Sequence, residues 1–134
     1  MKYSDLGLPI DLGAGALHSG QFLINGGSSV IATGQQPGFF ICPYAGIITG
    51  VTLIANISGS IQLDIWKAAS GSIPTSANSI VASDPPNVSA AQQSTDTTLT
   101  GWTTAITAGD VFAISVTSVS GITSVSVSLS ITGT

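Results

Sequence analysis

The sequence predicts an all-β domain, an antiparallel two-sheet β-sandwich of jelly-roll-like design. Three observations predict it. Apolar residues repeat with a period of two along several short runs, and clusters of Gly, Pro, Asn and Ser separate these runs at spacings of roughly 8–12 residues. No long window shows a helical period. Each strand then offers one apolar face to a shared core, and 134 residues suffice for one such domain.

The clearest expected strand lies near the C-terminus, where apolar residues alternate with serines. The apolar members are Val125, Val127, Leu129 and Ile131, and the serines are Ser124, Ser126, Ser128 and Ser130. One face of the strand is therefore apolar and the other is lined by hydroxyls. An uncharged strand of this kind pairs readily with other chains when it lies at a sheet edge. We expect it either inside a sheet or at an edge that assembly covers.

Three further runs have the same period, at residues 51–55, 61–65 and 112–116. The first two are joined by Asn56-Ile57-Ser58-Gly59, which predicts a hairpin. The third follows the expected turn Ala108-Gly109-Asp110. Weaker patterns predict strands near residues 21–24, 30–33, 38–42, 79–82 and 97–106.

Residues 1–20 are expected to form an extended N-terminal arm, and residues 21–134 the sandwich domain. Pro9 disfavours a helix before it, and glycines follow at positions 13, 15 and 20. The arm is too apolar for a free tail, and two interpretations stay open: it folds back on its own core, or it docks on a neighbouring subunit. The residues expected to make these contacts are Leu6, Leu8, Ile10, Leu12 and Leu17.

Charge is scarce in this chain. It has six aspartates, no glutamate or arginine, and two lysines, Lys2 and Lys67. Nucleic-acid binding needs clustered cations to neutralise phosphates, so we expect none. Weak mutual repulsion favours self-association instead. No apolar run approaches the roughly 20 residues of a spanning helix, and no secretory signal is evident, so we expect no membrane association and synthesis in the cytoplasm of the cell that makes the protein.

The residue types that catalysis requires are nearly absent. His18 is the sole histidine, and Cys42 is the sole cysteine and is expected to be buried. Asp84, Asp96 and Asp110 lie where turns favour aspartate, because its carboxylate accepts hydrogen bonds from nearby backbone amides. No nucleophile elbow, phosphate loop or metal-ligand spacing occurs. We therefore expect no enzymatic activity, no cofactor and no metal.

One strand face carries residues suited to binding. Gln62, Asp64 and Trp66 share the face opposite Ile61 and Leu63. An exposed tryptophan beside a carboxylate and an amide can stack on a sugar ring and bind its hydroxyls. The alternative is that Trp66 packs on a neighbouring strand or subunit while Asp64 binds backbone groups. The packing interpretation is favoured.

Several segments support a resemblance across residues 38–132. They are Ile48-Thr49-Gly50-Val51-Thr52-Leu53, Gly59-Ser60-Ile61-Gln62-Leu63-Asp64-Ile65-Trp66-Lys67, Ile73-Pro74-Thr75, Leu99-Thr100-Gly101-Trp102 and Ala108-Gly109-Asp110. Together they resemble a β-rich structural module of tailed-bacteriophage and prophage virion proteins, both tail-fibre-like and capsid decoration proteins. The resemblance implies a virion component, usually a trimer, and carries no catalytic residues over.

Here the module makes up nearly the whole chain, preceded by a short apolar arm. This favours a capsid decoration (cement) protein on the exterior surface of the virion, which binds and stabilises the lattice of the major capsid protein as a homo-oligomer. The alternative is a tail-fibre or receptor-binding module that recognises host surface glycans through Gln62, Asp64 and Trp66.

Overall fold

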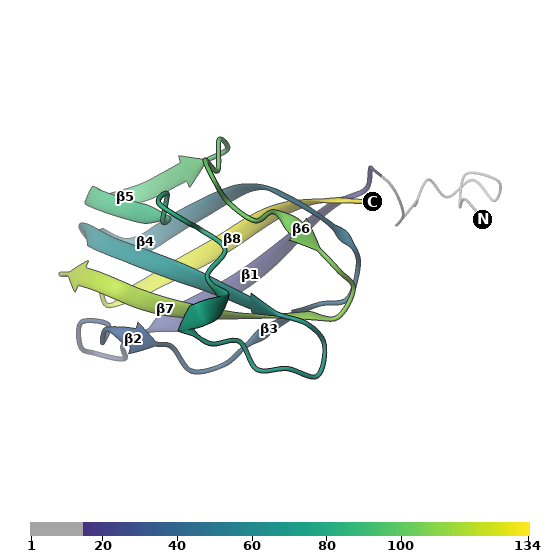
Figure 1. Cartoon of the computed structure of the whole chain (residues 1–134). Helices are drawn as coiled ribbons and strands as arrows, with labels where there is room; N and C mark the ends of the chain where they lie inside the picture. The colour runs from purple at the N-terminus through teal and green to yellow at the C-terminus, as the bar shows by residue number, and fades with distance from the viewer. Residues whose placement is uncertain (1–14) are drawn as a thin grey trace, which may run out of the picture.

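One curled antiparallel sheet contains every strand of the computed structural model, which describes residues 15–134 (Figure 1). The strands are β1 (Leu17–Asn25), β2 (Gly34–Gln35), β3 (Phe40–Cys42), β4 (Gly46–Ala68), β5 (Asn87–Asp96), β6 (Ala105–Ile106), β7 (Asp110–Ser120) and β8 (Ser124–Gly133). Their order is β1-β8-β4-β7-β2, with β3 also paired to β7, and β5 and β6 paired to β4. No α-helix occurs between residues 15 and 134. The all-β, antiparallel prediction is confirmed.

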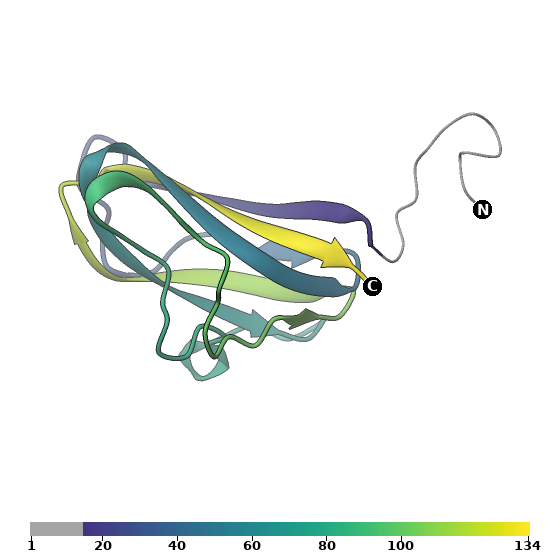
Figure 2. The same ribbon diagram turned by 90° about the horizontal axis from the view of Figure 1, so that it is seen from above.

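Strand β4 joins the two halves of the sheet. Its residues 46–55 pair with β8, and its residues 60–68 pair with β7. Between these two stretches the sheet curls, so that the two halves face each other across the core (Figure 2). Two separate sheets in jelly-roll order are not confirmed, because a single hydrogen-bonded ladder runs from β1 to β2.

The predicted hairpin at residues 56–59 is wrong, because β4 runs through these residues without a turn. Register shifts flank Gly59 on the β5 side, where it pairs with Ala91. A Cβ atom on Gly59 would lie 2.6 Å from the carbonyl oxygen of Ser120 and 2.8 Å from Cγ1 of Ile122. Glycine is required here by the close approach of other chain segments, not by the dihedral angles of a turn.

The serine-rich C-terminal strand, β8, lies between β1 and β4, so the interior placement is confirmed. Its apolar residues are buried: Val125, Val127, Leu129 and Ile131 are each 5% exposed or less. They pack with β4 and β7 residues such as Leu53, Leu63, Ile65 and Phe112 in one continuous core. The serines of β8 therefore point to the outer face of the sheet.

The weaker strand predictions are confirmed only in part. Residues 21–24 lie in β1, and 40–42 of the 38–42 prediction form β3. Residues 30–33 form a loop, residues 79–82 contribute a single bridge from Ser79 to Trp66, and the 97–106 prediction reduces to β6. Strand β5 was not predicted, because its sequence, Asn-Val-Ser-Ala-Ala-Gln-Gln-Ser-Thr-Asp, buries only Val88 fully.

The expected arm lies mostly outside the described residues, with Leu6, Leu8, Ile10 and Leu12 among those outside. Strand β1 begins at Leu17, before the expected domain boundary at residue 21, because Leu17 to Gly20 pair with β8. Leu17 is nevertheless 86% exposed. Cys42 is fully buried as a free thiol, as expected.

Candidate functional site

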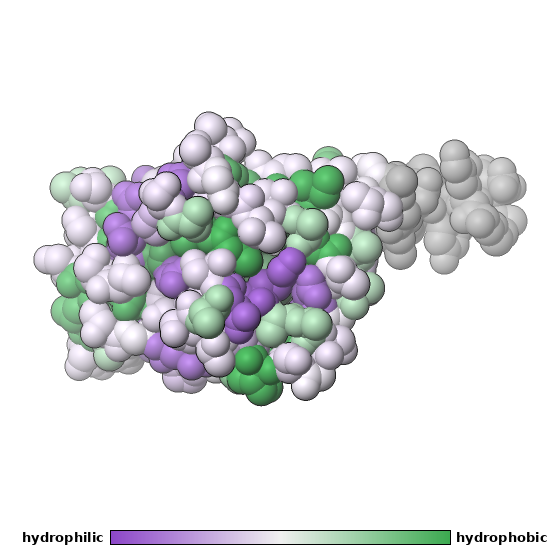
Figure 3. Space-filling model, in the orientation of Figure 1, coloured by the Kyte–Doolittle hydropathy of each residue, from purple (hydrophilic) through white to green (hydrophobic). Residues whose placement is uncertain are grey.

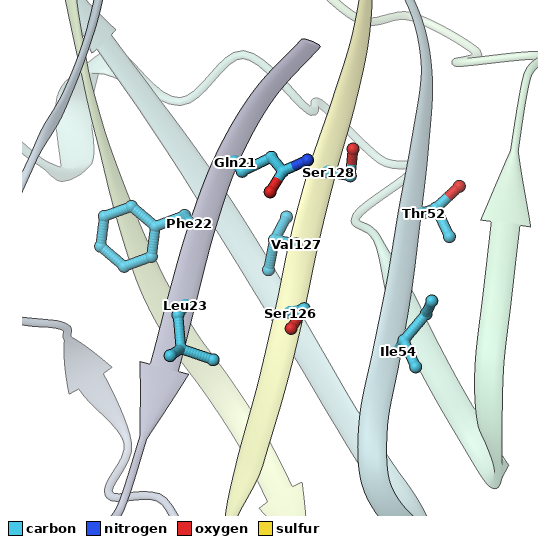
Figure 4. Close-up of a pocket in the computed structure, with 8 residues that line it drawn as sticks. All are labelled: Gln21, Phe22, Leu23, Thr52, Ile54, Ser126, Val127 and Ser128. Atoms are coloured by element: carbon cyan, nitrogen blue, oxygen red, sulfur yellow. The ribbon is translucent and has the colours of Figure 1, made fainter.

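A groove of about 570 Å³ runs over the outer face of β1, β8 and the first half of β4 (Figure 4). We call it the serine groove. Its lining residues are Gln21, Phe22 and Leu23 from β1, Thr52 and Ile54 from β4, and Ser126, Val127 and Ser128 from β8. Strand alternation explains the composition, because the serines that alternate with the buried residues of β8 form the floor.

Strand register explains the shape of the groove. Ser126 on β8 pairs with Leu23 on β1 and with Ile54 on β4, so the three residues form one row across the sheet. Neighbouring strands lie about 4.8 Å apart, which places the leucine and isoleucine about 10 Å from each other with the small serine between them. Leu23 is 62% exposed and Ile54 is 48% exposed. The groove thus has apolar walls and a hydroxyl-lined floor.

The same arrangement recurs at the other end of these strands. Thr132 on β8 pairs with Leu17 and with Ile47, which are both exposed. Single exposed apolar residues are ordinary on protein surfaces, but a set placed in register on one face is typical of an interaction surface. None of the residues of β1, β8 or residues 46–56 carries a charged side chain. By contrast, Figure 3 shows a different face, where hydrophilic residues gather near the centre.

The predicted binding residues Gln62, Asp64 and Trp66 lie in the second half of β4, away from the serine groove. Trp66 is only 8% exposed, and its Nε1–H donates to Oδ2 of Asp64 at 2.9 Å. The Ser79 hydroxyl donates to the other carboxylate oxygen at 2.5 Å. Trp66 is therefore not exposed as sugar stacking requires, and Asp64 binds the side chains of Trp66 and Ser79 where the packing interpretation expected it to bind backbone groups. A subunit contact at this face stays a prediction.

Two turn aspartates lie side by side near a polar pocket of about 160 Å³. Asp96 accepts backbone N–H bonds from Thr98 at 2.8 Å and from Leu99 at 3.3 Å, and Asp84 accepts one from Thr100 at 3.1 Å. Hydrogen bonding to the Asp96 carboxyl raises the pKa of Asp84, whereas the Thr98 amide is the main cause that lowers the pKa of Asp96. Sequence analysis placed both residues in turns but did not bring them together.

The remaining reactive residues gather around Tyr44. The His18 ring stacks on the Tyr44 ring with centroids 3.9 Å apart, and the Cys42 thiol donates to the Tyr44 carbonyl oxygen at 3.3 Å. Burial is the largest cause that raises the pKa of the Tyr44 hydroxyl. Within residues 15–134, no three side chains of His, Cys, Asp or Glu converge as metal ligands. That same range also contains no helix long and apolar enough to cross a membrane.

No family model and no curated protein matches this chain. Solved structures show weak likenesses. A truncated AlyQ with CBM32 and alginate lyase domains is 16% identical with a TM-score of 0.46, over 85% of this chain and 26% of that one. A chain of the cyanophage Pam1 capsid asymmetric unit is 19% identical with a TM-score of 0.34, over 93% and 89%. At these identities and scores, neither likeness carries an argument about function.

Proposed function

We propose that this chain is a non-enzymatic structural protein of a bacteriophage virion, and more narrowly a capsid decoration protein. It binds the outer surface of the head as a homo-oligomer, a trimer, and stabilises the lattice of the major capsid protein. The observation that carries the proposal is the uncharged outer face of β1, β8 and β4, where Leu17, Leu23, Ile47 and Ile54 are exposed in register.

The physical basis is burial of this face. Covering apolar surface contributes about 25 cal/mol per Å². Because the face has no charged side chain, covering it leaves no unpaired charge to be desolvated. Contacts of this kind, repeated over many copies in a shell, add through avidity even when a single contact is weak. A protein of this design needs neither a reactive group nor a cofactor.

The second candidate, a tail-fibre module that binds host glycans, has less support. Sugar stacking requires an exposed aromatic ring, whereas Trp66 and Trp102 are each 8% exposed. The indole N–H groups are also occupied, because Trp66 donates to Asp64 and Trp102 donates to the carbonyl oxygen of Asp84 at 2.8 Å. The serine groove offers hydroxyls, and the aromatic residue among its lining, Phe22, packs against the core.

Electron microscopy of purified phage or induced prophage particles that contain this chain tests the proposal. We expect many copies on the head, at symmetry-related positions. Leu23→Lys combined with Ile54→Lys should lower the affinity for heads at least about tenfold, because assembly of the homo-oligomer that binds the head would have to bury two ammonium groups. Ser118→Lys is the matched control at the exposed C-terminal end of β7 and should bind normally. A few copies at the tail, or none on the particle, would contradict the proposal.

A further inference from the structure

We propose that residues 6–12 of one subunit dock in the serine groove of a second copy of this chain. The inference rests on the proposed function, in which the protein works as a homo-oligomer, and names the contact that assembles it. Residues 1–14 lie outside the described part of the chain, so the argument compares their sequence with the groove. Leu6, Leu8, Ile10 and Leu12 occupy every second position of this segment.

The segment matches the exposed outer face of β1, which includes one side of the groove, in length and pattern. In an extended chain, a period of two places these four apolar side chains on one face. Leu6 and Leu12 are six residues apart, or about 20 Å, and the same six-residue interval separates Leu17 from Leu23 along β1. One end of the segment can therefore contact Leu23 and Ile54 in the groove, while its other end contacts the exposed Leu17 and Ile47 further along the same face. The middle of the segment then lies over the serine floor of β8, where small side chains leave room for it.

Charge and hydrogen bonding favour docking on the face over addition of a strand to an edge. The groove has no charged side chain, and Asp11, the one charged residue between positions 6 and 12, alternates with the apolar set. Docking can therefore leave its carboxylate in water. Pro9 has no N–H, so this segment would break the hydrogen-bond ladder of a strand added to an edge.

The position of Gly15, the first described residue, favours docking of the segment in the groove of a second copy over docking in the groove of its own chain. Gly15 N–H donates to Gly133 O, and Gly133 N–H donates to Ala16 O, both at 2.7 Å. These bonds hold the backbone in the plane of the sheet as far as Gly15, and only two residues separate it from Leu12. A tight turn there would return the chain beside β1, where the Tyr44 hydroxyl already lies 3.5 Å from Ser19 O at the free edge. Docking on another subunit does not require this turn.

Disulfide trapping in the full chain tests the proposal. Cys42 is fully buried and adds little background. One chain carries Leu8→Cys and another carries Ser128→Cys, and the two are mixed and oxidised. We expect a covalent heterodimer on a non-reducing gel, several-fold above a control mixture of Leu8→Cys with Ser118→Cys. A yield equal to the control would overturn the proposal. So would a chain carrying both Leu8→Cys and Ser128→Cys that closes only an internal disulfide.

A second variant measures the contact without cross-linking. Ser126→Arg fills the groove between Leu23 and Ile54, and we expect sedimentation to show at least tenfold weaker self-association, with Ser118→Arg unchanged. Circular dichroism verifies that both variants fold, and unaltered association of folded Ser126→Arg would contradict docking. The experiments distinguish failure of the capsid role from failure of the docking contact. If no cross-link forms but the heads are still decorated, only the docking contact is refuted. Cross-linked oligomers that are absent from heads would refute only the capsid role.

Discussion

Asp110 shows how one residue can serve a turn and the core together. Its Oδ2 atom accepts the backbone N–H of Thr107 at 2.8 Å and lies 3.5 Å from Nζ of Lys67. Lys67 also donates to the carbonyl oxygen of Ala105. The side chains of Lys67 and Asp110 are only 17% and 7% exposed. The expected turn role of Asp110 is therefore confirmed, and the ion pair adds a link from this turn to β4.

Removing this carboxylate should destabilise the fold. Asp110→Ala leaves the Thr107 amide and the Lys67 ammonium without their partner, and we expect a loss of about 2–3 kcal/mol in the free energy of unfolding. Asp110→Asn keeps a carbonyl acceptor for the amide and should lose less. Urea unfolding at neutral pH measures both. Equal stability of the alanine variant and the unmodified protein would show that the pair contributes nothing.

The Asp84–Asp96 pair should affect how stability depends on pH. The pKa of Asp84 is raised above its ordinary value of 3.8, so the folded state holds a proton that the unfolded chain releases. The retained proton adds to the free energy of unfolding at low pH, and this stabilisation is lost as pH rises through the raised pKa of Asp84. The lowered pKa of Asp96 acts in the opposite sense, and its contribution is lost as pH falls through that lowered pKa.

Asp84→Asn separates these two contributions. The amide can still donate to Asp96 but does not titrate, so the loss of stability as pH rises above about 4 should disappear. Because both aspartates are only partly buried, we expect a change of only a few degrees in Tm. Thermal melts across the acidic range, beside the unmodified chain, measure it. An unchanged pH profile would mean that the two carboxyls do not share a proton in solution.

At the scale of the strand, Gly59 distinguishes a continuous β4 from the hairpin that the sequence suggested. Gly59→Ala forces a Cβ atom against the Ser120 carbonyl oxygen and Ile122, and we expect a loss of about 1–3 kcal/mol from overpacking. Gly50→Ala is the matched control in the same strand, because its nearest neighbours would lie 3.4 Å away. Denaturant unfolding compares the two. Similar stabilities would favour an open turn at residues 56–59.

Period-two patterns predicted β7, β8 and the two halves of β4, because each of these stretches buries at least one complete face. Strand β5 escaped prediction because it lies at an edge of the sheet and packs mainly through Val88 and the half-buried Ala91. The hairpin prediction failed for a related reason. A glycine between two apolar runs fits a turn and a close approach equally well, and only the position of Ser120, more than fifty residues away, distinguishes them.

The candidate site was less predictable than the fold, since it depends on which strands are neighbours. The serine face of β8 is visible in the sequence, but its walls come from Leu23 and Ile54, far from Ser126 along the chain. Trp66 shows the opposite problem. Alternation placed it correctly on the outer face of its strand but could not show the bridge from Ser79 or the loop with η2 (Ser76–Asn78) that contacts β4.

For the molecule as a whole, the scarcity of charge predicts how assembly responds to salt. Only 6% of residues are charged, and the proposed contact face has none. Salt therefore screens few charge–charge interactions in the contact, and we expect the association constant to change less than about twofold between low and high sodium chloride. Sedimentation equilibrium at several salt concentrations measures this. A steep decrease with salt would mean that ion pairs assemble the oligomer, and that the apolar face does not.

Resistance to trypsin should follow from the same composition. Lys67 is the only cleavage position among residues 15–134, and it lies within β4, paired with Phe112 of β7 and close to Asp110. A protease needs an extended, accessible segment, so cleavage here requires opening of the sheet. Mass spectrometry of a native digest should show almost no fragment ending at Lys67, whereas Asp110→Ala should increase that fragment as its stability falls. Rapid cleavage of the unmodified protein at Lys67, comparable with that of the chain in urea, would place this strand outside the stable core.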